Sequence, residues 1–184
     1  MKVLAFAASN SRASINKQLV GHAINVLTHE IEPNADCELI DLNDYEMAIY
    51  SIDRQTEGGI PQLAHDFYAK IGGADALIIS FAEYNGSFTS AYKNIYDWAS
   101  RIDMKVFQGK PILMMAASPG GRGGASVLKS AMDTAPYFGG DVVASVSVAK
   151  FPEVFDHETG ALTNEDLSAQ LRTGLTALKQ AVSA

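Results

Sequence analysis

Short, mostly apolar runs alternate along the chain with segments whose apolar residues recur every three or four positions. The runs occupy residues 1–7, 37–41, 76–81, 112–118 and 142–148. Runs of this length, bounded by polar and glycine-rich segments, are typical of strands buried on both faces of a parallel sheet. The sequence therefore predicts five strands, which are separated by other structure.

The segments between and after these runs carry the period of helices with one apolar face. The predicted helices cover residues 15–27, 61–71, 89–101, 127–135 and 167–182. Ser14 is placed to cap the first helix, and Pro61 suits the first turn of the second, which Gly72-Gly73 ends. Thr163 and Asp166 have the spacing of a capping box for the last helix. Residues 43–60 have no regular pattern and are interpreted as a surface excursion.

Strict alternation of strands and helices defines the fold class. It predicts an α/β protein with a doubly wound, five-stranded parallel sheet of the flavodoxin-like type, in the order 2-1-3-4-5, with helices on both faces. No repeat, linker or low-complexity tract interrupts the chain, so we expect residues 1–184 to form one domain.

Composition narrows the choice of partners and compartment. The chain has 184 residues and is 47% hydrophobic. Its formal net charge of -7 disfavours nucleic acid as a partner. The same charge permits one small phosphorylated ligand, because a local group of N–H donors can hold an anion. No apolar run approaches a membrane span, and the first strand does not resemble a signal peptide. Cys37 is the single cysteine, so the chain has no internal disulfide; we interpret Cys37 as a core residue and expect a cytoplasmic protein.

Three polar loops follow the first, third and fourth strands, at residues 9–16, 82–87 and 118–124. Because the carboxyl ends of parallel strands meet at one edge of a sheet, we expect these loops to form a single ligand site. The first loop offers hydroxyl groups and the N–H groups of a helix start, which suit a phosphate, and Arg12 adds charge. A plain N-cap with solvated serines is the alternative interpretation of this loop.

The second and third loops suit a flat ring with a polar edge. Tyr84 offers an aromatic face, and residues 85–87 offer N–H groups; a tight turn with a surface tyrosine is the alternative. Glycines in the third loop allow close approach of the backbone to a ring, or simply a flexible turn. These are Gly120, Gly121, Gly123 and Gly124.

The chain resembles the NADPH-dependent FMN reductase family, which includes related quinone, azo-dye and chromate reductases. The matching pieces are SNSRASIN at 9–16, EYNGS at 83–87 with KNIYDWASR at 93–101, and ASPGGRGG at 117–124. The resemblance runs from Met1 to about Val148. It implies a flavodoxin-like fold that binds FMN, with NADPH or NADH as the source of hydride.

The resemblance also assigns the site residues. Those expected around the FMN phosphate are Ser9, Ser11, Arg12, Ser14, Ile15 and Asn16. Those expected along the isoalloxazine ring are Ala82, Glu83, Tyr84, Asn85 and Gly86, with Ser118, Gly120 and Gly121 at its far edge. The family usually has proline where Ala82 stands, and it has Ile-Pro-Gly where this chain has Phe88-Thr89-Ser90. This segment borders the ring, so the choice of acceptor is expected to differ from that of better-known members.

The expected reaction passes hydride from NAD(P)H through bound FMN to a small-molecule acceptor such as a quinone, an azo compound or free flavin. The flavin supplies the chemistry, so no catalytic side chain is expected; backbone N–H groups of Gly120 and Gly121 would stabilise its negative charge when reduced. The alternative is a flavodoxin-type electron carrier without NAD(P)H turnover. A hydrolase is disfavoured because the Gly-x-Ser-x-Gly elbow is missing from the sequence.

The remaining chemistry-bearing residues suggest no other site. The four histidines have no metal-ligand spacing, so no metal is expected, and His22 and His29 are interpreted as solvent-facing or capping residues. Aromatic residues crowd the helix beside the proposed site, as core or as a subunit contact. They are Phe88, Tyr92, Tyr96 and Trp98. The resemblance favours a homodimer or homotetramer.

Overall fold

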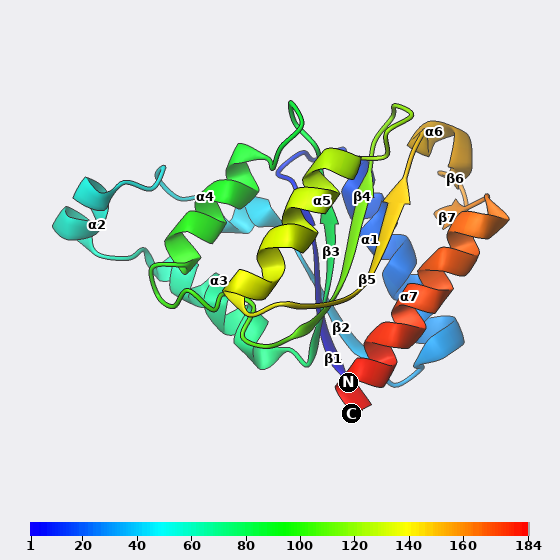
Figure 1. Ribbon diagram of the computed structural model, residues 1–184, viewed down its shortest axis with the longest axis horizontal. Helices are drawn as coiled ribbons and strands as arrows, with labels where there is room; N and C mark the ends of the chain where they lie inside the picture. Colours follow the sequence, from blue (N-terminus) through cyan, green and yellow to red (C-terminus); the bar gives the residue numbers. More distant parts are fainter. Residues whose placement is uncertain (184) are drawn as a thin grey trace.

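The computed structural model describes residues 1–183, and its centre is a sheet of five parallel strands (Figure 1). The strands lie in the order β2-β1-β3-β4-β5. Their bounds are β1 (Lys2–Ala8), β2 (Asp36–Ile40), β3 (Ala76–Phe81), β4 (Pro111–Ala117) and β5 (Asp141–Val148). Order and direction confirm the predicted flavodoxin-like sheet, and each strand boundary lies within one residue of its predicted place.

Successive side chains of the inner strands point to opposite faces of the sheet and contribute to two separate cores. In β1, Leu4 and Phe6 pack into one core, whereas Val3 and Ala5 pack into the other. Helices cover both cores (Figure 1). On the first face lie α3 (Gln62–Gly73), α4 (Ser90–Ala99) and α5 (Ala125–Thr134), and on the opposite face lie α1 (Ile15–Val26) and α7 (Glu165–Ser183). Two covered faces explain why the inner strands read as continuous apolar runs.

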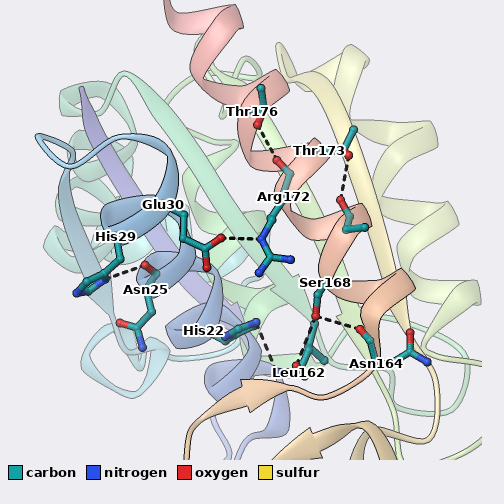
Figure 2. Close-up of polar contacts among 11 residues, drawn as sticks. His22, Asn25, His29, Glu30, Leu162, Asn164, Ser168, Arg172, Thr173 and Thr176 are labelled. Carbon is teal, nitrogen blue, oxygen red and sulfur yellow. Dashed lines mark hydrogen bonds and ion pairs between the residues drawn. The ribbon is translucent and has the colours of Figure 1, made fainter.

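Ion pairs fasten the last helix to the end of the first. A π-helical turn, Leu27–Ile31, extends α1 and brings Glu30 beside α7, where the Nε of Arg172 lies 2.6 Å from its carboxylate (Figure 2). Lys179 pairs with Glu32 at 3.0 Å. These groups are largely exposed, so the pairs orient the helix more than they stabilise it.

The histidines near this junction have structural roles. The ring of His22 is half-buried, packs edge-on against Phe155 and accepts a 3.5 Å hydrogen bond from the N–H of Leu162 (Figure 2). Burial lowers the pKa of His22, and the nearby Arg172 lowers it further. His29 is exposed and bonds to the carbonyl oxygen of Asn25. The expectation of a solvent-facing residue or a helix cap is therefore wrong for His22, because the ring lies under the 155–162 segment.

The region between β2 and α3 is more regular than predicted. It contains a 3-10 turn, Leu42–Tyr45, and the short helix α2 (Ile52–Gly58), which projects from the body (Figure 1). Ser51 caps α2 by accepting a hydrogen bond from the N–H of Arg54. None of the residues of α2 is buried, so the helix lacks the apolar stripe that would reveal it in the sequence.

Two predicted helix ends differ in the structure. Pro61 precedes α3 as its capping position, and the helix runs through Gly72-Gly73 instead of stopping before them. The predicted capping box of Thr163 and Asp166 is wrong. The side chain of Asn164 accepts the N–H of Leu167 instead, one residue later than predicted.

Short elements between β5 and α7 were not predicted. They are α6 (Phe151–Val154), β6 (Phe155–Asp156) and β7 (Ala161–Leu162), of which the last two form a hairpin. Segments of two to four residues are too short to carry a measurable hydrophobic period.

Candidate functional site

The three polar loops emerge from one edge of the sheet, at the top in Figure 1. They follow β1, β3 and β4, which are neighbours in the sheet. The chain places β2 on one side of β1 and then returns to place β3 on the other, so the strand order reverses at β1 and β3. Ligands of open α/β sheets bind beyond the carboxyl ends of the strands at such a reversal.

The first loop ends at a well-formed helix start. The hydroxyl oxygen of Ser14 accepts a hydrogen bond of 3.2 Å from the N–H of Lys17, as a helix cap does. Ser9 is buried and accepts from the N–H of Ser11, whereas Arg12 is exposed and forms no ion pair with residues 1–183. The first N–H groups of α1, including that of Ile15, point out of the helix end and have no partner inside it. The loop therefore presents donors and a cation to the rim.

The side chain of Asn16 is committed to the protein interior. Its Oδ1 accepts from the hydroxyl of Ser80 at 2.7 Å and from the N–H of Ala117 at 2.9 Å, and its Nδ2 donates to the carbonyl oxygen of Ala117 at 3.2 Å. Asn16 is only 2% exposed. It thus joins the start of α1 to β3 and to the end of β4, and only its backbone N–H is free to serve a phosphate.

The second loop closes on a two-residue turn. Tyr84 and Ser87 exchange backbone hydrogen bonds of 3.0 and 3.1 Å across Asn85 and Gly86. Both turn residues have positive φ, 53° and 77°, which is the conformation that an Asn-Gly hairpin turn requires. Tyr84 is 50% exposed at the rim. The predicted free N–H of Ser87 is wrong, because that group donates to Tyr84; Asn85 and Gly86 retain theirs.

Glu83 links the second loop to the third. Its carboxylate Oε2 accepts a 2.9 Å hydrogen bond from the N–H of Val127, in the first turn of α5. Gly124, the residue before α5, has no side chain with which to cap that helix, so the cap comes from the neighbouring loop. One carboxylate oxygen of Glu83 is thereby engaged, although we expected this residue to line a ring.

Thr89 links the second loop to the first. It is almost fully buried, and its hydroxyl donates to the carbonyl oxygen of Ala8, the last residue of β1, at 3.0 Å. The same hydroxyl oxygen caps α4 by accepting from the N–H of Tyr92. Asn16, Glu83 and Thr89 therefore tie the three loops to one another through buried or half-buried hydrogen bonds.

The glycines of the third loop fall into two groups. Gly123 and Gly124 have positive φ, and a Cβ added to them would lie 2.3 Å from the Ser147 hydroxyl and 2.8 Å from Ala116, respectively. A Cβ at Gly120 or Gly121 would meet no atom within 4 Å. The fold therefore requires the second pair of glycines, whereas the first pair borders open space at the rim.

Ser118 fixes the path of the third loop. Its hydroxyl donates to the carbonyl oxygen of Gly120 at 3.1 Å, and its own N–H and carbonyl groups bond to Val148 and Phe151. The N–H of Lys150 also donates to Gly120. The polar groups of Ser118 are thus largely engaged within the protein, while the N–H groups of the following glycines lie in an exposed turn.

An ion pair supports the first loop from outside. The Nζ of Lys17 lies 2.5 Å from Oδ2 of Asp41, and Oδ1 of the same carboxylate accepts from the N–H of Asn43. These hydrogen bonds, that of Lys17 first, lower the pKa of Asp41 to about 2. The side chain of Asn43 in turn donates to the carbonyl oxygen of Asn10. The charge on Asp41 therefore helps to hold the loop in place.

Sequence reasoning missed Ser80 and Thr89 as members of this network. Ser80 is a polar residue in an otherwise apolar strand, and a buried hydroxyl needs a hydrogen-bond partner. That pattern was a usable signal, although the partner was not deducible from it. Within residues 1–183, no group of three or more His, Cys, Asp or Glu is arranged to hold a metal ion.

The fold and the rim together define a class of protein: a flavodoxin-like α/β domain with a helix start and two further loops at the carboxyl edge of its sheet. A sequence profile described as NADPH-dependent FMN reductase matches residues 1–153, and the chain belongs to this family. The match ends in α6 and covers all three loops.

Relatives with assigned activities agree with this membership. An NAD(P)H-dependent FMN reductase of Pseudomonas aeruginosa is 33% identical over 123 residues, which cover 65% of this chain and 61% of that protein. A quinone reductase of Escherichia coli is 28% identical over 178 residues, covering 89% and 92% of the two chains. Among solved structures, the Paracoccus denitrificans flavoenzyme NAD(P)H:(acceptor) oxidoreductase superposes with a TM-score of 0.76 at 22% identity, covering 99% of this chain and 97% of that one. The protein is thus an oxidoreductase, and these findings support FMN and NAD(P)H as its cofactor and reductant.

Proposed function

We propose that the protein is an FMN-dependent NAD(P)H oxidoreductase that passes hydride through bound FMN to a small quinone. Azo compounds and free flavin are further candidate acceptors. The observation that carries the proposal is the joining of three loops at one sheet edge by the side chains of Asn16, Glu83 and Thr89. The quinone reductases among the relatives supply the choice of acceptor.

The residues of the first loop fit the FMN phosphate. The start of α1 offers N–H groups and the positive end of the helix dipole, which favour an anion. Arg12 is exposed and unpaired within residues 1–183, and the hydroxyls of Ser11 and Ser14 keep donor protons for a phosphate oxygen. Ser9 supports the loop from below by holding the N–H of Ser11.

The other two loops fit the two sides of the flavin ring. Tyr84 would lie along the ring, with the N–H groups of Asn85 and Gly86 at its polar edge. Gly120 and Gly121 would approach from the far side, where the space that a Cβ would fill is empty. Bound FMN supplies the acceptance and release of hydride. The protein residues bind and orient it, and no side chain of this chain is needed as an acid or base.

The function is tested by binding and turnover with matched ligands. We expect the purified protein to bind FMN, to lose the absorbance of oxidised flavin on addition of NADPH or NADH, and to recover it with benzoquinone. Arg12→Gln should weaken FMN binding by about tenfold, the cost of one charged hydrogen bond, and leave the binding of riboflavin, which lacks the phosphate, unchanged. Arg54→Gln is the control, because Arg54 lies on the helix α2, outside the three loops. Failure to bind FMN, or equal losses for both ligands, would contradict the proposal.

The assembly and the compartment belong to the same proposal. We propose that residues 1–184 form one domain that assembles into a homodimer or homotetramer and acts in the cytoplasm. None of the helices within residues 1–183 has the length and apolar character needed to cross a bilayer. Light scattering at micromolar concentration should give twice or four times the mass of the chain, 19.7 kDa. A measured mass equal to one chain would contradict the proposed assembly but not the proposed binding of FMN.

A further inference from the structure

A cavity of about 140 Å³ lies between α4 and α5, on the face of the sheet below the second loop. Its floor is formed by Phe81 and Met114 of the sheet, and its walls include Tyr92 and Tyr96 of α4 and Ala131 of α5. Phe88, Phe107 and Phe138 also line it. An apolar cavity of about 150 Å³ holds one molecule of the size of benzene. The space therefore fits a single six-membered ring.

Two phenol hydroxyls are the unsatisfied polar groups of this cavity. Tyr92 is only 4% exposed, yet its hydroxyl makes no hydrogen bond with residues 1–183, and neither does that of Tyr96. No fully enclosed polar side-chain atom in the described part of the chain lacks a partner. The hydroxyl of Tyr92 therefore faces the open space of the cavity and not packed protein. Burial raises the pKa of both tyrosines, so both stay neutral hydrogen-bond donors.

The other polar groups along the cavity already have partners. Lys93 pairs with Asp97 at 2.6 Å, and the Ser100 hydroxyl donates to the carbonyl oxygen of Asp97. The Thr134 hydroxyl donates to the carbonyl oxygen of Ser130 within its own helix. A water molecule in the cavity would have the two phenol hydroxyls as partners, which is the lower end of the two to four hydrogen bonds that usually hold a buried water.

We propose that this cavity binds a one-ring aromatic molecule that carries a hydroxyl or carbonyl oxygen, with the ring among the aromatic side chains and the oxygen on the Tyr92 hydroxyl. Aromatic walls favour an aromatic guest because edge-to-face contacts add to the burial of apolar surface. The oxygen completes the hydrogen bonding of a hydroxyl that the protein leaves open. The cavity adjoins the second loop through Phe81 and Phe88, but no residue of the three loops lines it, and the inference does not depend on the proposed flavin chemistry.

Phenol is the probe, because it is not reduced by NAD(P)H, and toluene is its partner without a hydroxyl. In a titration of the full chain labelled with ¹⁵N, phenol should cause saturable shifts at the amides of Ala131 and Thr134 and leave those of Ser14 and Gly120 unmoved. The same shifts are expected in the presence of saturating FMN. Absence of saturable shifts, or displacement of FMN by phenol, would overturn the proposal.

Two substitutions distinguish the contribution of the Tyr92 hydroxyl to binding from that of the cavity volume. Tyr92→Phe should weaken phenol binding by roughly three- to tenfold, the worth of one hydrogen bond, and leave toluene binding unchanged. Ala131→Leu should abolish the binding of both by filling the cavity, with Ala131→Val as a milder version if the larger side chain prevents folding. Tyr45→Phe is the control, because Tyr45 is buried on the same face but does not line the cavity. Equal losses of phenol and toluene in Tyr92→Phe, or unchanged binding in Ala131→Leu, would contradict the site.

Discussion

A single buried amide connects the first loop to the sheet. Asn16 satisfies the hydroxyl of Ser80 and both backbone groups of Ala117, so three elements meet on one side chain. When a buried polar group loses its partner, the free-energy cost of its desolvation remains. That cost exceeds the net contribution of one hydrogen bond to stability. Asn16 is therefore a positioning residue, whose loss should reach the site through its neighbours.

We expect Asn16→Ala to lower the free energy of unfolding by about 3 kcal/mol, since it leaves the Ser80 hydroxyl and the Ala117 N–H unpaired in the interior. Urea unfolding measures this change. Asn10→Ala is the matched control: Asn10 is exposed in the same loop, and only its backbone carbonyl is engaged, so its effect should stay within about 0.5 kcal/mol. Similar losses in the two variants would mean that the network around Asn16 contributes nothing specific.

Glu83 offers a second test at the residue scale. Glu83→Ala removes the cap of α5 and should cost about 1 kcal/mol of stability, whereas Glu83→Gln keeps an acceptor oxygen and should cost less than half of that. Both should weaken FMN binding if the second loop depends on this link. Glu57→Ala, on the exposed helix α2, serves as the control. If Glu83→Gln lowers the stability as much as Glu83→Ala does, the acceptor oxygen of Glu83 does not cap α5.

At the scale of elements, the third loop contains one glycine that the fold requires, Gly124, and one that we expect only the ligand to require, Gly120. Gly124→Ala forces a side chain into a backbone with φ of 72° and against Ala116, and should cost about 2–3 kcal/mol. Gly120→Ala meets no atom and lies outside the left-handed region, so stability should change by less than about 1 kcal/mol.

Binding should show the opposite order for these two glycines. Gly120→Ala should reduce FMN affinity by about tenfold or more, because its methyl group occupies space assigned to the ring edge. Thermal unfolding and flavin fluorescence titration measure the two effects on the same samples. A Gly120→Ala protein with unchanged FMN affinity would remove the third loop from the site.

The support of the first loop should depend on pH. The folded state lowers the pKa of Asp41 from 3.8 to about 2, so the stabilisation is complete above about pH 4 and is lost as the pH falls towards 2. We expect Asp41→Asn to lower stability at neutral pH by about 1 kcal/mol after allowance for solvent screening, with the difference from wild type vanishing near pH 2. Asp44→Asn, an exposed neighbour, is the control. A difference that is independent of pH would show that the ion pair with Lys17 is not its cause.

Elements with a buried face were predictable from the sequence, and exposed ones were not. The strand Ala76–Phe81 and the cap at Ser14 lie where the sequence predicts them, because burial imposes a period and a cap imposes a residue type. The helix α2 was missed because it buries nothing. The cap at Asn164 was assigned to Thr163 because both residue types suit that position.

Across the whole molecule, the meeting of the three loops was predictable from the sequence, but the contacts between them were not. The position of the three loops followed from the topology of the sheet, so their meeting at one edge was predictable. Their connections were not, because Asn16 and Ala117 are 101 positions apart, and Glu83 and Val127 are 44 apart. Only the tertiary structure reveals that Asn16 and Glu83 serve as links between loops.

The net charge of the chain is opposite in sign to the charge that its first loop presents. The chain carries a formal net charge of -7, yet its first loop presents Arg12 and a helix start to the rim. Backbone donors and one cation act over a few ångströms, within the screening length of physiological salt, so they can hold an anion against the overall charge. The acidic surface therefore does not argue against a phosphorylated cofactor.

We propose above that three loops at one edge of the sheet bind a single FMN. The most direct measurement is a titration of the unliganded protein with FMN, in which amide shifts map the bound molecule and the end point gives its stoichiometry. We expect one FMN per chain and simultaneous shifts at Arg12, Gly86 and Gly121, one from each loop. Failure to bind, or binding that leaves any of the three loops unmoved, would contradict the account.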